Sequence, residues 1–151
     1  MKRGRPKKKL EDIKTSELKK IAATEFQLLR RLECADDRGY CVCCTCGATS
    51  KYNENMQGGH YVGRSVNLYL LDPLNVHPQC SWCNGMGKGM PDHYYVFLCG
   101  KYGEEAADTL LQARKRKNGI KTHKLTKPFL IDFIQETRAK IRKEKERVGA
   151  F

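Results

Sequence analysis

Four cysteines stand in two pairs with the spacing of metal ligands. Cys43 and Cys46 are separated by two residues and followed by Gly47, and Cys80 and Cys83 repeat the spacing. Four thiolates suit one tetrahedral Zn²⁺, so the sequence predicts a structural zinc site. No apolar export signal follows the basic N-terminus, so we expect a cytoplasmic chain that is not secreted. In a reducing compartment, paired cysteines favour metal over disulfides.

The segment "CVCCTC" leaves a second choice of zinc ligands. Cys41 and Cys44 have the same spacing as Cys43 and Cys46. We favour the later pair, because a glycine after the second cysteine helps backbone amides to turn toward the sulfur atoms. The sequence alone leaves both choices open.

Polar residues of a recognisable order surround the second cysteine pair. His60 lies in "GGHYV", Asn75 and His77 lie in "NVHPQC", and Asn84 directly follows Cys83. This order resembles the HNH, or ββα-metal, nucleases. The full pattern of Cys-x-x-Cys-Gly, Gly-His-Tyr and Asn-x-His-x-Gln-Cys-x-x-Cys-Asn is similar to that of the NinG-type recombination endonucleases of lambdoid phages, and the similarity extends over residues 25–145.

This resemblance implies a role for each polar residue. His60 would end the first strand of a β-hairpin and act as the general base that activates water, as a neutral imidazole can near pH 7. Asn75 would tie the hairpin together and orient His60. Asn84 would start a helix and offer an oxygen to Mg²⁺ or Mn²⁺ at the scissile phosphate. His77 would ligate the ion, bind phosphate or simply pack.

The residue before His60 departs from many HNH enzymes, which carry an aspartate there. Gly59 occupies this position, as in the Gly-His form of the NinG-type group. One usual ligand of the catalytic ion is therefore missing. Water, His77 or Asp72 could fill its place.

The elements that must position these residues form an α+β, mostly helical pattern. Residues 15–33 carry apolar residues at helical spacing, and another helix is expected from 126 to about 147. The segments "HYV" and "VNLYLL" are strand candidates, and "CSWCNG" is expected to enter a short helix. We therefore expect a zinc-stapled ββα-metal finger flanked by N-terminal and C-terminal helices.

The chain divides into four expected regions by composition. A disordered basic tail covers residues 1–14, and a basic amphipathic helix covers 15–33. The zinc-bound nuclease core covers 34–102, and a basic helical region covers 103–151. Within the tail, "KRGRPKKK" resembles an AT-hook, whose basic residues enter the narrow A·T minor groove; this motif includes Arg3, Arg5 and Lys7.

Positive charge is concentrated at the two ends of the chain. The formal net charge is +12; residues 1–33 carry 11 Lys or Arg against 5 Asp or Glu, and residues 111–151 carry 13 against 4. Such clustering predicts contact with a polyanion, and we expect DNA. The residues expected to contact backbone phosphate are Arg30, Arg31, Arg64 and Lys88. The sequence contains no long apolar run, so no membrane span is expected.

Three functions are compatible with these features. By resemblance, the first is a metal-dependent endonuclease acting on recombination intermediates such as branched DNA, Holliday junctions or D-loops. The second is a non-catalytic zinc-ribbon DNA-binding protein, which leaves His60 and Asn84 without roles. The third is a zinc-stabilised adaptor for another protein, which makes the charge incidental. Symmetric cleavage of a junction needs two active sites, so a homodimer is attractive for the first.

Overall fold

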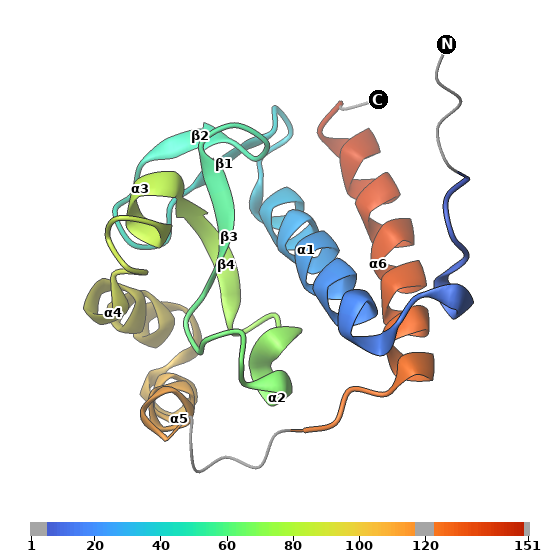
Figure 1. Ribbon diagram of the computed structural model, residues 1–151. Helices are drawn as coiled ribbons and strands as arrows, with labels where there is room; N and C mark the ends of the chain where they lie inside the picture. Colours follow the sequence, from blue (N-terminus) through green and yellow to red (C-terminus); the bar gives the residue numbers. More distant parts are fainter. Residues whose placement is uncertain (1–5, 117–122, 150–151) are drawn as a thin grey trace.

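The computed structural model describes residues 6–116 and 123–149. The elements run, in order, η1 (Leu10–Asp12), α1 (Thr15–Cys34), β1 (Tyr40–Val42), β2 (Thr49–Lys51), β3 (Met56–His60), α2 (Asn67–Leu70), β4 (Val76–Cys80), α3 (Ser81–Asn84), α4 (Pro91–Tyr102), α5 (Glu104–Lys115) and α6 (Lys127–Arg147). The β3–β4 hairpin lies between α1 on one side and α3 with α4 on the other (Figure 1). α6 packs on α1, and α5 packs on α4 (Figure 1). The predicted α+β, mostly helical class is confirmed.

The first and last helices match their predicted ranges and bury their apolar faces against each other. Leu18, Ala22 and Phe26 of α1 are buried at helical spacing. The rings of Phe26 and Phe133 meet edge to face, with centroids 5.6 Å apart. The apolar faces of α1 and α6 therefore pack on each other within one chain and complete its core. Among the described residues, no helix is both long and apolar enough to cross a membrane.

Charged side chains fasten α6 to α1. Arg147 donates hydrogen bonds to the carbonyl oxygens of Leu32 and Ala35, at 2.8 and 2.9 Å. These carbonyls lie at the C-terminal end of α1, where the usual N–H donor four residues ahead is missing, although the Leu32 carbonyl also accepts from the N–H of Ala35 at 3.1 Å. Arg138 also pairs with Glu25 of α1 at 2.9 Å. The end of the expected C-terminal region is thus part of the core packing.

The β3–β4 hairpin has two different faces. The strands pair antiparallel, with Met56 opposite Cys80 and His60 opposite Val76. A Cβ added at Gly58 would collide with Gln27 of α1, whereas one added at Gly59 would collide with Gln79. Since successive residues of a strand point to opposite faces, even positions of β3 face α1 and odd positions face α3 and α4.

The loop between these strands differs from its prediction. The segment "VNLYLL" was expected to be a strand, but its residues Asn67–Leu70 form the short helix α2. The prediction was wrong because the apolar side chains of this segment lie on a single turn of helix, and only Leu70 of that turn is buried. The strand β4 gave no alternating signal, since all five of its residues are buried.

The basic tail is more ordered near α1 than its composition predicted. Residues Leu10–Asp12 form one turn of 3₁₀ helix, and Leu10 and Ile13 pack against the core that contains Leu18. The prediction of disorder over residues 1–14 is wrong for this turn, because two apolar side chains anchor it. Residues 1–5 lie outside the described part of the chain.

Candidate functional site

The two cysteine pairs converge on one point. The turn between β1 and β2 carries Cys43 and Cys46, while the end of β4 and the start of α3 carry Cys80 and Cys83. Their four sulfur atoms lie within 4.8 Å of one another. The Sγ atoms of Cys46 and Cys80 are 3.7 Å apart. Tetrahedral Zn–S bonds of about 2.3 Å place ligand sulfurs about 3.8 Å apart, so the cluster fits Zn²⁺.

Backbone hydrogen bonds shape the first half of the cluster. The N–H of Cys43 donates to the Ala48 carbonyl at 2.8 Å, and the N–H of Gly47 donates to the Cys43 carbonyl at 3.0 Å. Gly47 has a φ of +77°, a left-handed conformation that favours glycine. The N–H of Cys44 donates to Pro78 of β4 at 2.9 Å, which fixes the turn against the hairpin.

The alternative ligands Cys41 and Cys44 lie outside the cluster. Burial raises the pKa of Cys41 to about 11, and burial also raises the pKa of Cys44. The position of their sulfur atoms outside the group of four is what excludes them as ligands of the same ion. The preference for Cys43 and Cys46 is confirmed.

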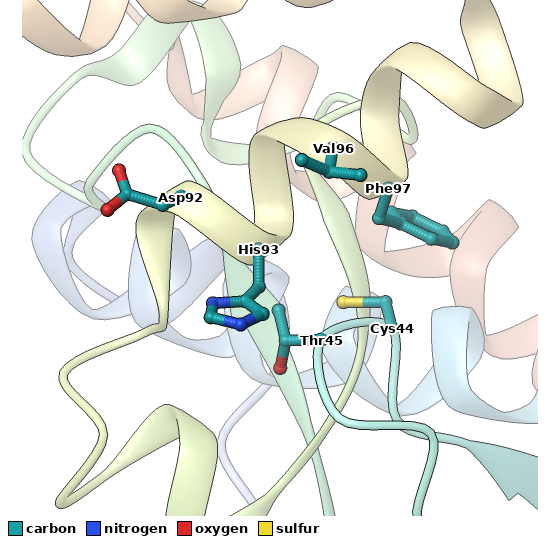
Figure 2. A pocket seen from close by; sticks show the side chains of 6 residues that line it. All are labelled: Cys44, Thr45, Asp92, His93, Val96 and Phe97. Carbon is teal, nitrogen blue, oxygen red and sulfur yellow. The ribbon is translucent and has the colours of Figure 1, made fainter.

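A cavity of about 400 Å³ separates the cysteine turn from α4. Its lining residues are Cys44, Thr45, Asp92, His93, Val96 and Phe97 (Figure 2). Cys44 and Thr45 come from the turn, and the other four come from α4 (Figure 2). The predicted catalytic residues His60, Asn75 and Asn84 are not among them, so this cavity is separate from the expected site.

His60 has the bonding pattern of a neutral base. It is the last residue of β3, as the resemblance implied. Its Nε2 lies 2.9 Å from the carbonyl oxygen of Leu70, and because a carbonyl only accepts, Nε2 must carry the proton. The Nδ1 atom is then unprotonated, and it is buried without a hydrogen-bond partner among the described residues. Burial lowers the pKa of His60. The hydrogen bond to the Leu70 carbonyl raises this pKa, whereas the positive charge of Arg64 lowers it.

Asn75 ties together the two ends of the loop that follows His60. Its Oδ1 accepts from the N–H of Val62 at 2.7 Å, and its Nδ2 donates to the carbonyls of Val62 and Tyr69, each at 3.0 Å. The side chain is fully buried. Tyr69 and Leu70 are adjacent in α2, so Asn75 also fixes the helix whose carbonyl holds the His60 ring. This geometry makes Asn75 a positioning residue for His60.

His77 has no free nitrogen for an ion or a phosphate. It is fully buried, and its Nδ1 and Nε2 lie 3.0 and 2.8 Å from the hydroxyls of Tyr94 and Tyr102. Because the Tyr94 hydroxyl donates to the Gly59 carbonyl, His77 Nδ1 must donate to Tyr94, and Nε2 accepts from Tyr102. Burial lowers the pKa of His77 to about 3. Its expected catalytic and metal-binding roles are corrected to packing.

Asn84 lies at the other end of the hairpin from His60. It is the last residue of α3, not the first as the resemblance implied. Its Nδ2 donates to Gln57 Oε1 at 2.7 Å, which leaves Oδ1 for another ligand. Gln57 precedes His60 by three residues, so their side chains point to opposite faces of β3. The structure therefore places Asn84 and His60 on different faces of the hairpin rather than side by side.

Gln79 explains why residue 59 is a glycine. Its Nε2 donates to the Gly89 carbonyl at 2.8 Å and to Thr45 Oγ1 at 3.2 Å, which directs Oε1 toward Gly59. This oxygen is buried and has no hydrogen-bond partner among the described residues. It fills the space that an aspartate at position 59 would need. Sequence reasoning missed this role, although Gln79 is part of the quoted motif.

The amide oxygens of Asn84 and Gln79 are of a chemical type that can bind a divalent ion. Gln79 pairs with Gln57 across the hairpin, and Gln57 bonds Asn84, so both amide oxygens belong to the face of the hairpin toward α3. Amide oxygens are ligands for the hard cations Mg²⁺ and Mn²⁺. They carry no charge, and Gln79 is fully buried, so an ion at the partly exposed Asn84 would need phosphate oxygens as further ligands.

Two arginines expected to contact DNA are used within the fold. Arg30 is buried, and its guanidinium donates to the Val76 carbonyl at 2.9 Å and to Glu33 at 2.7 Å. Arg31 donates to the carbonyls of Tyr52 and Met56, at 2.8 and 3.1 Å. Both bind carbonyl groups of neighbouring segments, so their predicted DNA-binding role is corrected to a structural one.

The other expected DNA contacts differ in how the structure presents them. Lys7, Arg64 and Lys88 are exposed. Arg3 and Arg5 of the AT-hook-like motif lie outside the described residues. Lys88 belongs to three successive residues with left-handed backbone: its φ is 54°, and those of Gly89 and Met90 are 85° and 46°. Strained backbone of this kind is concentrated at functional sites.

We predict that Lys88→Gly and Lys88→Ala weaken DNA binding equally but differ in stability. Both lose the positive charge, whereas only glycine adopts a φ of 54° without a Cβ penalty. Lys88→Gly should be more stable than Lys88→Ala by about 1 kcal/mol. Thermal unfolding and DNA titration measure the two effects. If both variants bound DNA as tightly as wild type, Lys88 would not contact phosphate.

The fold and the cysteine cluster define a small α+β protein with a zinc-type Cys₄ site between two antiparallel hairpins. The sequence model of the bacteriophage lambda NinG protein family matches residues 2–147. The chain belongs to this family, as its central motif predicted. A search of curated proteins and a search of solved structures each found no significant match.

Proposed function

We propose that this protein is an HNH-type, metal-dependent and structure-selective DNA endonuclease. The observation that carries the proposal is the His60 ring, whose Nε2 proton is held by the Leu70 carbonyl and whose Nδ1 is left unprotonated and unpartnered. A lowered pKa keeps this nitrogen ready to accept a proton near neutral pH. The alternative, a non-catalytic zinc-ribbon DNA-binding protein, assigns no role to this nitrogen.

The side chains on the hairpin would act from its two faces. His60 Nδ1 would take a proton from the attacking water, while Asn75 and the Leu70 carbonyl hold the ring in place. Among the described residues β3 pairs only with β4, so its other edge has no strand partner. A phosphate at this edge would lie between the two faces, and His60 Nδ1, which is buried in the free protein, would have to become accessible to it when DNA binds.

His60 and Gln57, the partner of Asn84, are three residues apart along β3 and point to opposite faces of the hairpin. One phosphate would therefore have to meet both groups at the free edge of β3. Asn84 would hold a divalent ion, which supplies stabilisation of negative charge on the phosphate and the leaving 3′ oxygen.

The substrate class follows from the family resemblance and from charge. NinG-type enzymes suggest recombination intermediates, namely branched DNA, Holliday junctions or D-loops. The basic excess at both chain ends is compatible with holding more than one duplex arm. Paired cleavage of a junction would require two copies of the chain, so we propose that a homodimer acts on it.

We expect the zinc-loaded protein to cut a synthetic four-way junction only when Mg²⁺ or Mn²⁺ is added. Cleavage of a linear duplex of the same sequence should be at least tenfold slower. The control omits the divalent ion rather than adding a chelator, because a chelator would also remove zinc. Gel analysis of end-labelled strands gives both rates. If the protein bound the junction but left it intact with either ion, the non-catalytic zinc-ribbon DNA-binding function would replace this proposal.

A further inference from the structure

Two adjoining cavities lie beside α1, one against the loop that follows β3 and the other against α6. The first, of about 550 Å³, is lined by Ser16, Lys19, Lys20, Ala23, Thr24, Arg64 and Leu70. The second, of about 360 Å³, is lined by Lys20, Ile21, Thr24, Glu25 and Arg138. They share the exposed residues Lys20 and Thr24, which lie between them, and the two hollows together are called the groove below.

The unpaired charges that line this groove are positive. Lys19, Lys20 and Arg64 form no ion pair among the described residues. The one acidic residue in the lining, Glu25, already pairs with Arg138 at 2.9 Å. The exposed residues Ser16 and Thr24 lie about one helical turn before and after the two lysines. Cations accompanied by hydroxyl donors are the groups that bind phosphate oxygens.

The groove leads to the proposed base. Leu70 lines it, and the carbonyl of the same residue holds His60 Nε2 at 2.9 Å. Arg64 also lines it and is close enough to His60 to affect its pKa. Both His60 and the groove belong to the side of the hairpin that faces α1. Within the first cavity, the helical rise from Ser16 to Thr24 is about 12 Å, which is long enough to contact more than one phosphate of a DNA strand.

We infer that this groove binds the phosphate backbone of one DNA strand and leads that strand to His60. The inference rests on the proposed function, and it assigns binding roles to Lys19 and Lys20 beside Arg64. It also replaces Arg30 and Arg31, the α1 residues expected from sequence, with residues about three turns closer to the N-terminus of the same helix.

The test compares two double charge reversals. Lys19→Glu/Lys20→Glu changes the groove, and Lys51→Glu/Lys101→Glu makes the same change of net charge at exposed residues of β2 and α4, outside the groove and outside the two basic ends of the chain. Fluorescence anisotropy with a labelled four-way junction, at several salt concentrations and without added Mg²⁺ or Mn²⁺, gives affinity and salt dependence. Thermal unfolding confirms that both variants are folded, and Lys19→Ala/Lys20→Ala replaces the reversal if it is not.

The groove variant should lose at least tenfold in affinity, and the slope of log K against log salt should fall by about 2, because two phosphate contacts are lost. The control variant should change affinity by less than threefold. Equal losses in both variants would overturn the groove while leaving the endonuclease proposal intact. A wild-type protein that bound no DNA would overturn both.

Discussion

Replacing Cys83 by serine should remove zinc, cooperative unfolding and DNA cleavage together. The cluster joins the β1–β2 turn to the β4–α3 junction, and Cys43, Cys80 and Cys83 are themselves part of the buried core with Met56 and Val76. Zinc binding is worth about 10–16 kcal/mol in small zinc-dependent peptides, which exceeds or equals the whole stability of a typical domain. Loss of one thiolate therefore should leave no stable fold. Zinc content by mass spectrometry and circular dichroism melting provide the measurements.

The matched control is Cys99→Ser, which removes a half-buried thiol of α4 outside the cluster. It should retain one zinc ion per chain and melt close to wild type. A Cys83→Ser protein that kept its zinc and its melting temperature would contradict the ligand assignment. If Cys44→Ser alone lost zinc, Cys41 and Cys44 would instead be supported as ligands, although both lie outside the cluster.

Elements whose signal is local could be predicted from the sequence. The range of α1 followed from apolar residues such as Leu18 and Phe26 at helical spacing, and the cysteine spacing identified the four ligands. The end of β3 at His60 agreed with the family motif. In each case the determining residues lie within a short stretch or within one motif.

Features that depend on packing from both sides could not be predicted. The polar residues of β4 gave no strand pattern, because Gln79 and His77 are buried by contacts with Thr45, Tyr94 and Tyr102 from distant segments. Arg30 looked like a surface cation, yet the carbonyl that accepts its hydrogen bond belongs to Val76, 46 residues away. Residue type alone does not reveal such partners.

Replacing His60 by alanine should reduce junction cleavage by about 10²–10⁴-fold, the usual contribution of general base catalysis. DNA affinity should stay close to wild type, because His60 is neutral and the proposed phosphate contacts lie elsewhere. The lost hydrogen bond to Leu70 should cost about 1 kcal/mol of stability. His60→Gln is the sharper variant, since its amide N–H can still donate to that carbonyl while providing no base.

The pH dependence of cleavage should report the same group. Burial lowers the pKa of His60 below its ordinary value of 6.5, so Nδ1 remains unprotonated above that value and cleavage should be flat there. The rate should fall only as pH decreases through the lowered pKa. Protonation also favours the unfolded state, whose histidine has the higher pKa, so the stability that His60 contributes is lost in the acid range and not in the alkaline range.

The most direct test is to measure binding and cleavage of one end-labelled four-way junction by wild type and His60→Gln, in Mg²⁺ with zinc-loaded protein. We predict equal dissociation constants and products from the wild type alone, with a rate for the variant at least 100-fold lower. Equal cleavage by both proteins, or equal binding with no cleavage by either, would contradict the assignment of His60 as the base of an endonuclease.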